Sequence, residues 1–317
     1  RQAKEKLGID VTISNLWGAD LISILSMGRD KKVSLGLINI RDNPTNRLMV
    51  SMRSVVGQVY RGFDRVLAIC RPLADELREL YDIDAGALGT FRNFVPAVHP
   101  QAVWPASSPD TMQRFVFCGR MVAEKNLDAL LHAWAKSSGA IPTRQLVVLG
   151  GGELQEPSMR TARTLGLSVG TSVDDASASV LFLGMVKRPE DYMVGATAFV
   201  LPSRHEGVPT VLLLALSLGL PVIASDCLAG GVRDVLEGGA KPRPDGGEDV
   251  AAGVLLPIPD PTRAATIDAW VSAIDQAATD GAAHARWTAG AKELSKLYGE
   301  AAVKKSWMNE IARLAAP

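Results

Sequence analysis

Short apolar runs alternate with helical patterns along most of this chain of 317 residues. Many runs precede a segment such as "NLDALLHAWAK", in which apolar residues recur at the spacing of one helix face. Because the runs are continuously apolar, they are typical of strands buried on both faces, with helices on each side of a parallel sheet. The pattern therefore predicts a doubly wound α/β fold. The runs are, in chain order, "IDVTIS", "KKVSLGLI", "FDRVLAIC", "LGTF", "RFVFCG", "QLVVLG", "VLFLG", "AFVLP", "PVIAS" and "GVLLP".

A proline-rich stretch without periodicity divides the chain. It spans residues 95–113, reads "VPAVHPQAVWPASSPDTMQ", and is typical of an interdomain linker. We expect two Rossmann-like domains: a partial first domain over residues 1–98, a linker over 99–113, and a second domain over 114–290, with closing helices over 291–317. The first domain has about four strands and the second about six. Four strands are few, and the chain does not begin with Met, so we expect a fragment that lacks the opening strands.

The amino-acid composition argues against a nucleic-acid-binding protein and against a membrane-spanning protein. Lys and Arg number 34 and Asp and Glu also number 34, so no charge excess points to nucleic acid. No apolar stretch approaches the ~18 residues that a membrane span needs. The three cysteines are far apart and odd in number, which predicts free thiols and a cytoplasmic protein. The four histidines are scattered, so we predict no metal site.

Candidate chemistry lies where strands lead into helices, because ligands of open α/β sheets bind beyond the carboxyl ends of the strands. Arg120 and Lys125 precede a helix with Asn126 as its expected N-cap. Two cations and free N–H groups predict a phosphate or pyrophosphate site there, with solvated surface charges as the alternative.

Two glycine clusters also follow predicted strands. Gly150–Gly152 lack the third glycine of a dinucleotide fingerprint, because Gln155 stands at that position, and we expect them to allow close backbone approach instead. Gly230 and Gly231 fit a simple turn as well as a binding site.

The segment "SRHEGVPTVLLLALSLGLPVIASD" places Glu206 before an apolar helix, with Pro209 in its first turn. Glu206 is either a helix-start acid or a carboxylate that binds a polyhydroxylated ligand, with the N–H groups of Gly207, Val208 and Thr210 nearby. We expect His205 to be exposed rather than catalytic.

Several of these stretches together resemble the C-terminal domain of glycosyltransferase family 4. They are "GRMVAEKNLDALLHAW", "LVVLGGGEL", "VLFLGMVKRPEDYMVGATAFVLPSRHEGVPTVLLLAL" and "GLPVIASDCLAGGVRDVLEGG". The resemblance runs from about residue 113 to 260, and residues before the linker are similar to the later half of the family's first domain. It implies a retaining transferase of the GT-B fold that uses a nucleotide-diphosphate sugar, without metal or other cofactor.

The resemblance also implies roles for individual positions. Gly119, Arg120 and Lys125 match the region that holds the donor pyrophosphate, and the two cations would stabilise the departing diphosphate. Glu206 matches the first acid of a paired-acid motif and would contact the transferred sugar. Val186 matches a region that addresses the base, and Gly207 and Thr210 would meet the sugar or phosphate; we therefore take Glu206, Lys125 and Arg120 as the catalytic residues.

The sequence also departs from the family. The second acid of the motif would fall at position 214, where Leu214 cannot accept hydrogen bonds from ribose hydroxyls. The glycine-rich loop on the acceptor side is absent, and Arg41 and Asn43 stand where many members carry a histidine.

The leading hypothesis is transfer of a sugar to a glycan or lipid-linked acceptor in cell-surface polysaccharide synthesis. A lipid carrier would place the protein at the inner face of the membrane. The alternatives are a nucleotide-sugar epimerase or hydrolase of similar fold, and a non-catalytic partner subunit, which Leu214 and the short first domain favour.

Overall fold

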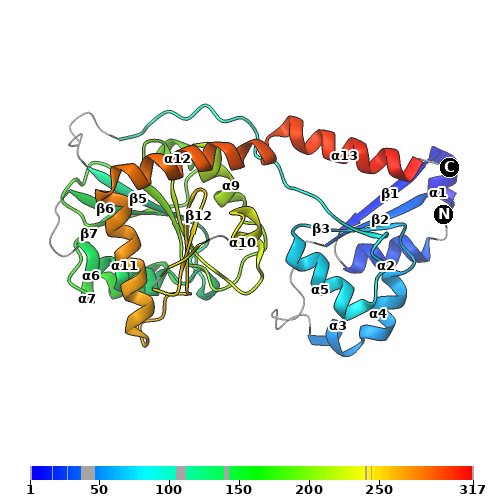
Figure 1. Ribbon diagram of the computed structural model, residues 1–317, viewed down its shortest axis with the longest axis horizontal. Coiled ribbons are helices and arrows are strands. Elements are labelled where there is room, and N and C mark those ends of the chain that lie inside the picture. The colour runs from blue at the N-terminus through cyan, green and yellow to red at the C-terminus, as the bar shows by residue number, and fades with distance from the viewer. Residues whose placement is uncertain are drawn as a thin grey trace.

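The computed structural model shows two lobes, each built on its own sheet (Figure 1). The smaller lobe holds a four-stranded sheet and the larger a nine-stranded sheet among the described residues. The two-part α/β architecture predicted from the sequence is thus present. The structure describes residues 2–15, 17–26, 28–36, 47–104, 112–138, 143–239, 241–243 and 245–315.

The smaller lobe is a parallel sheet with strands in chain order, β1-β2-β3-β4. Its core joins β3 to helices α4 and α5 through apolar side chains such as Val66, Leu67 and Leu73. The four strands lie where the apolar runs predict them. The elements are α1 (Gln2–Leu7), β1 (Val11–Asn15), α2 (Trp17–Leu25), β2 (Lys31–Gly36), α3 (Arg47–Ser51), α4 (Arg53–Tyr60), β3 (Arg65–Ala68), α5 (Arg71–Tyr81) and β4 (Leu88–Thr90).

The larger lobe has the strand order β11-β12-β13-β10-β9-β5-β6-β8-β7. β5 leads to β6 on one side and pairs with β9 on the other, so the winding reverses between β5 and β9. Such a reversal is the topological switch point at which open α/β sheets bind ligands. The strands are β5 (Gln113–Cys118), β6 (Arg144–Leu149), β7 (Val169–Gly170), β8 (Val180–Gly184), β9 (Ala198–Leu201), β10 (Val222–Ser225), β11 (Lys241–Pro242), β12 (Glu248–Val250) and β13 (Gly253–Leu256).

Alternate residues of β5 enter two different cores, one on each face of the sheet. Phe115 and Phe117 pack with α6, α7 and α11, whereas Val116 packs with α9 and α10. This double burial explains why the strands are continuously apolar in sequence. The helices are η2 (Ala123–Lys125), α6 (Leu127–Ser138), α7 (Gln155–Thr164), α8 (Glu190–Met193), α9 (Thr210–Ser217), α10 (Gly231–Val235), α11 (Ala264–Thr279), α12 (Gly281–Ser295), η3 (Lys296–Tyr298) and α13 (Glu300–Ala315).

The sequence pattern missed three short strands, since β7, β11 and β12 have only two or three residues each. β11 and β12 also pair antiparallel at the edge of the sheet, unlike the other strands of this lobe.

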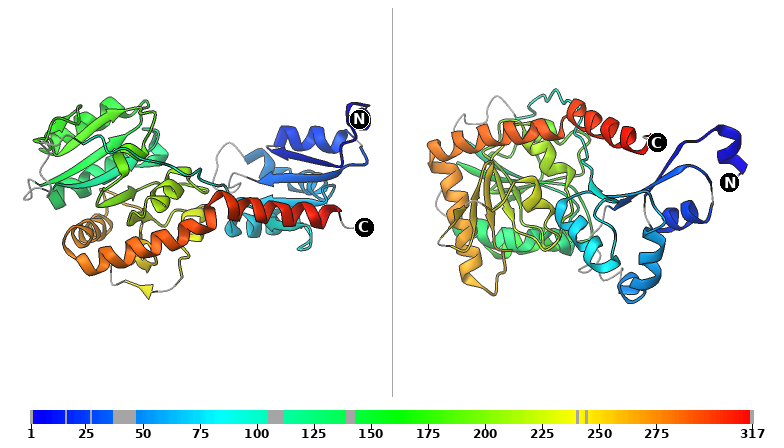
Figure 2. Two further views of the ribbon diagram at one scale, coloured as in Figure 1. Left: turned by 90° about the horizontal axis from the view of Figure 1, so that it is seen from above. Right: turned by 45° about the vertical axis from the view of Figure 1, so that its right-hand side comes forward.

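The chain crosses between the lobes through the expected linker and again through η3 and α13 (Figures 1 and 2). The two crossings meet where Val95 N donates to the carbonyl oxygen of Tyr298 at 3.1 Å. α13 then lies along the smaller lobe, where Leu314 joins the core and Arg65 pairs with Glu310. The closing helices were expected to begin at residue 291, but that position lies inside α12, and the crossing itself begins after it.

Residues 99–104 of the linker are fixed to the larger lobe. Arg188 Nη2 donates to His99 O at 2.9 Å, and Gln101 N donates to Asp191 Oδ1 at 2.7 Å. The Arg114 guanidinium lies 4.1 Å from the centroid of the Trp104 ring. These contacts hold the first part of the linker against α8 and β5.

Candidate functional site

The candidate site lies at the switch point, where the loops after β5 and β9 meet. The first loop carries Gly119, Arg120 and Lys125, and the second carries Glu206. Arg204 N donates to the carbonyl oxygen of Glu124 at 2.8 Å, which joins the two loops through their backbones. The topology therefore brings the predicted charged residues to one edge of the sheet.

Lys125 and Glu206, which are 81 positions apart, form an ion pair. Lys125 Nζ lies 2.5 Å from Glu206 Oε1, and the two side chains are 18% and 9% exposed. Ser203 Oγ donates to the same oxygen at 2.7 Å. Glu206 is thus a nearly buried carboxylate held by two donors, rather than only an acid at a helix start.

Arg120 differs from Lys125 in its surroundings. Its side chain is exposed, and no described residue forms an ion pair with it. The predicted pair of cations therefore consists of one lysine already bound to a carboxylate and one arginine open to solvent.

The glycines after β6 allow the close backbone approach that the sequence predicts. A Cβ on Gly150 would lie 2.0 Å from the carbonyl oxygen of Gly119, and a Cβ on Gly152 would lie 2.6 Å from that of Met121. Both glycines also have positive φ, at 121° and 152°. Their role is to pack the loop after β6 against the loop after β5, which carries the cations.

Asn126 stands at the expected N-cap position, directly before α6, but its side chain bonds to other loops instead of capping the helix. It has φ 54°, in the left-handed region, and it ends the short helix η2. Its buried side-chain nitrogen donates to the carbonyl oxygens of Pro202 at 3.1 Å and Pro259 at 3.0 Å. The side chain ties the loops after β9 and β13 to the loop of Lys125, because amide donors satisfy carbonyls that would otherwise be buried unpaired.

The loop after β10 supports Glu206 from another side. A Cβ on Gly231 would lie 1.8 Å from the carbonyl oxygen of Gly207, so only glycine fits at the start of α10.

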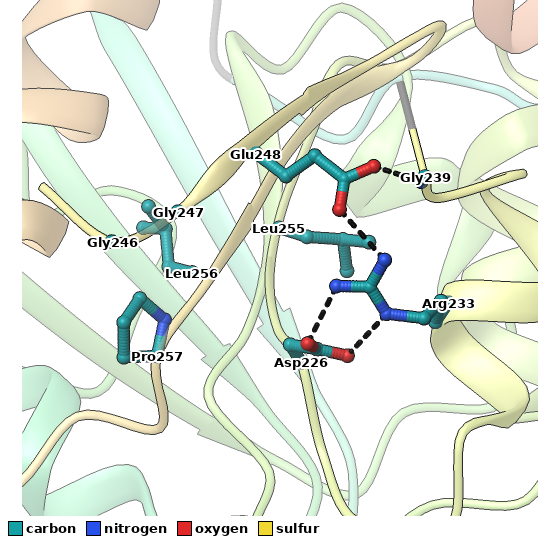
Figure 3. Close-up of a pocket in the computed structure, with 9 residues that line it drawn as sticks. All are labelled: Asp226, Arg233, Gly239, Gly246, Gly247, Glu248, Leu255, Leu256 and Pro257. Atoms are coloured by element: carbon teal, nitrogen blue, oxygen red, sulfur yellow. Dashed lines mark hydrogen bonds and ion pairs between the residues drawn. The ribbon is translucent and has the colours of Figure 1, made fainter. Parts of the chain in front are cut away.

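Figure 3 shows Arg233 between Asp226 and Glu248, with Nη2 2.6 Å from Asp226 Oδ2 and Nη1 2.6 Å from Glu248 Oε2. The arginine fixes α10 to the end of β10 beside a pocket of about 470 Å³.

Other predicted positions vary in exposure. Val186 is half-buried against the core, and Thr210 is exposed at the first residue of α9. Pro209 precedes α9 instead of lying in its first turn. His205 is half-buried rather than exposed. Leu214 packs against the same core as Val186, so its side chain continues the apolar face of α9.

Arg41 and Asn43 lie outside the described residues. Within the described part, no cluster of three or more His, Cys, Asp or Glu side chains is suited to a metal ion. No helix there is long and apolar enough to cross a membrane.

The cysteines are free, as predicted, and two of them adjoin the site. Burial raises the pKa of Cys118, beside Gly119, to about 11. Burial and the nearby Glu206 raise the pKa of Cys227 to about 12. Both thiols are therefore protonated at neutral pH and act as packing groups rather than nucleophiles.

Sequence reasoning missed Ser203, Arg233 and the cross-linking role of Asn126. Ser203 stands three residues before Glu206, which was the available signal. Nothing in the local sequence indicates that Arg233 meets Glu248 or that Asn126 meets Pro259, because these contacts depend on how distant loops fold together.

Sequence comparison places these features in a known family. Residues 112–280 match the family model of glycosyl transferases group 1. The D-inositol 3-phosphate glycosyltransferase of Nocardiopsis dassonvillei is 28% identical over 313 residues, covering 91% of this chain and 66% of that protein. The chain spans 28% of the length of a glycosyltransferase of Methanocaldococcus jannaschii, which is 32% identical over 38% of this chain. It spans 39% of a glycosyltransferase of Haemophilus influenzae, which is 26% identical over 46% of this chain.

Solved structures share the fold. The apo form of the lipopolysaccharide outer core galactosyltransferase WaaB superposes with a TM-score of 0.69 at 21% identity, covering 98% of this chain and 77% of that one. Anabaena Alr3699/HepE in complex with UDP superposes with a TM-score of 0.72 at 14% identity, covering 98% and 80%. Because the family model matches more than half of the residues, this chain belongs to the glycosyl transferases group 1.

Proposed function

We propose that this protein transfers a sugar from a nucleotide-diphosphate sugar to a glycan or lipid-linked acceptor, with retention of anomeric configuration. The observation that carries the proposal is the Lys125–Glu206 pair at the switch point between β5 and β9. Ligands of open sheets bind at this place, and a cation next to a carboxylate offers partners for both a phosphate and a sugar hydroxyl.

The charges suit a nucleotide-diphosphate sugar. Lys125 and Arg120 follow the same strand, so both can approach one pyrophosphate, and cations held before the reaction stabilise the charge that develops on the leaving group. Glu206 accepts hydrogen bonds, as a carboxylate contacting a sugar must. HepE, one of the structures that share the fold, is solved with UDP, which supports this class of donor.

We infer the chemical class of the acceptor from the names of similar proteins. WaaB is named a lipopolysaccharide outer core galactosyltransferase, and the Nocardiopsis relative is named a D-inositol 3-phosphate glycosyltransferase. A glycan acceptor fits a role in cell-surface polysaccharide synthesis, which we propose for this protein. The protein would act on the cytoplasmic side, at the membrane face where lipid-linked acceptors lie.

Leu214 supports a second candidate, a non-catalytic relative that serves as a partner subunit. Its apolar side chain cannot accept hydrogen bonds from a ribose, and an unpaired buried hydroxyl costs about 1–3 kcal/mol. A protein of this kind would keep the fold of the larger lobe but bind the donor weakly.

Calorimetric titration with UDP, GDP, ADP and the corresponding nucleotide sugars tests the proposal. We expect heat of binding for one nucleotide and its sugar derivative. No heat for any of them would favour the partner subunit. Product analysis with and without an acceptor separates a transferase from an epimerase or hydrolase, since only the transferase requires the acceptor, and the anomeric proton signals of the product report retention.

Variants at the ion pair test the assignment of residues. We expect Glu206→Ala and Lys125→Ala each to abolish transfer while the melting temperature stays high enough for a folded protein at assay temperature. Lys136→Ala and Glu293→Ala break exposed ion pairs away from the site, with Asp268 and Lys296, and should leave transfer unchanged. Wild-type rates in both site variants would refute the assignment.

A further inference from the structure

The two oxygens of the Glu206 carboxylate have different surroundings. Oε1 accepts hydrogen bonds from Lys125 Nζ at 2.5 Å and from Ser203 Oγ at 2.7 Å. Within the described part of the chain, Oε2 has no hydrogen-bond donor, although the residue is only 8% exposed. One oxygen is therefore occupied by the protein and the other is left for a ligand.

Lys125 cannot produce this difference alone. The lysine ammonium is a compact charge that attracts either oxygen of a carboxylate. The last torsion of a glutamate side chain is broad and roughly two-fold, so the carboxylate can turn and exchange its oxygens. A second donor from another direction is needed to fix which oxygen meets the lysine.

Ser203 is that second donor, and it is rigidly placed. Its side chain is fully buried at the end of β9, between Pro202 and Arg204. Ser225 Oγ, at the end of β10, donates to the carbonyl oxygen of Ser203, and Ser225 is also buried. Neighbouring strands thus hold the Ser203 hydroxyl against Glu206.

We infer that Ser203 is a positioning residue that orients the Glu206 carboxylate, so that Oε2 accepts a hydrogen bond from a hydroxyl of the donor sugar. Ser203 does not touch the ligand and acts through Glu206. The inference rests on the proposed function and goes further, because it gives Ser203 a role and assigns the contact with the sugar to one oxygen of Glu206.

The test compares binding of a nucleotide sugar with binding of its nucleoside diphosphate, for example UDP-glucose and UDP, or the pair that binds wild type. Loss of a hydrogen bond to a charged group corresponds to an affinity change of about tenfold or more. We expect Ser203→Ala to weaken binding of the nucleotide sugar by about that factor and to leave binding of the nucleoside diphosphate unchanged. A distortion of the whole site would weaken both.

A double-mutant cycle separates positioning from general packing. If Ser203 acts through Glu206, Ser203→Ala has no further effect on sugar binding in the Glu206→Ala background. Equal effects in both backgrounds, or no effect of Ser203→Ala in the wild-type background, would overturn the inference.

Two further variants keep the test decisive. Ser203→Cys replaces the hydroxyl with a slightly larger group that is a weaker donor, so we expect an affinity between those of wild type and Ser203→Ala. An affinity equal to wild type would count against the inference if the alanine variant does not fold. Ser295→Ala removes an exposed hydroxyl from α12, which donates to Lys292 O, and should bind both ligands as wild type does. If wild type binds no nucleotide sugar in the panel, the proposed function itself fails; a normal wild type with an unaffected Ser203→Ala refutes the inference alone.

Discussion

At the scale of single residues, the Lys125–Glu206 ion pair is nearly buried, so both charges lose most of their contact with water. Removing one partner of such a pair leaves an uncompensated charge, whereas two removed charges leave none. The double variant Glu206→Ala, Lys125→Ala should therefore be more stable than at least one of the single variants. Burying two charges costs free energy of desolvation, so the presence of this ion pair at the switch point is better explained by ligand binding than by a contribution to stability.

Asp20 in the smaller lobe is a buried carboxylate with a different role. It accepts hydrogen bonds from Ser14 Oγ at 2.6 Å and Ser34 Oγ at 2.9 Å, and it is 2% exposed. No described cation forms an ion pair with it, and burial raises its pKa above the ordinary value of 3.8 despite the two hydroxyls. The folded protein therefore binds the proton on Asp20 more tightly than the unfolded chain does.

The pH dependence of stability follows from this shift. A raised pKa contributes stability that is present below the unfolded pKa, near 3.9, and is lost as pH rises through the folded pKa. We predict that Asp20→Asn unfolds at a higher temperature than wild type at pH 7, because the neutral amide avoids the buried charge and serine hydroxyls can accept as well as donate. The difference should shrink as pH falls toward 4, as melting curves at several pH values would show. A variant less stable than wild type at pH 7 would contradict the prediction.

The sequence indicates candidate residues for a site but not the contacts between them. Glu206 and Lys125 stand out because they are charged at the ends of apolar runs, where ligands bind in this class of sheet. Their mutual contact, and the contact of Ser203 with the same oxygen, depend on how the chain folds between residues 81 positions apart and on the order of β5 and β9. Local sequence carries no information about that order.

At the scale of elements, the loops at the carboxyl ends of the strands form one connected layer. Asn126 joins three of them, because its side chain links its own loop to the carbonyl oxygens of Pro202 and Pro259. This residue is also in the left-handed conformation, which asparagine tolerates better than most residues. Its side chain and its backbone therefore both stabilise the position of Lys125.

We predict that Asn126→Ala lowers the free energy of unfolding by about 2–3 kcal/mol, since two buried carbonyls lose their donor and alanine is strained in this conformation. Asn126→Gly removes the same hydrogen bonds without the strain and should lose less. Urea denaturation of the three proteins measures both effects. Equal stability of the alanine variant and wild type would show that the loops are held by other contacts.

The elements themselves were largely predictable because their patterns are long and consistent. Ten apolar runs correspond to ten strands, and the closing helices expected over residues 291–317 correspond to the end of α12, η3 and α13. β7, β11 and β12 were not predictable, since two or three residues are too few to establish a period. Asn126 directly precedes α6, as the N-cap prediction requires, but the sequence pattern did not predict the short helix η2 that ends there.

At the scale of the whole molecule, the last helix of the chain belongs to the core of the first lobe. The ring of Trp307 on α13 lies 5.8 Å from that of Phe91, and Leu314 is buried in the core of the smaller lobe. Figure 2 shows α13 extending from the larger lobe along the smaller one, with both chain ends at the same side. Amphipathic periodicity predicts the helix but not the lobe that it covers.

This placement predicts that a change in α13 destabilises the smaller lobe alone. Trp307→Ala removes a half-buried ring, so we expect the free energy of unfolding of the smaller lobe to fall by about 2 kcal/mol. Native-state hydrogen exchange should show faster exchange in β3, α5 and β4, while β5, β6 and β9 of the larger lobe exchange as in wild type. Met308→Ala, at a neighbouring position that is 59% exposed, serves as the matched control and should change neither lobe. Faster exchange in both lobes, or in α13 alone, would show that α13 is not part of the first lobe's cooperative core.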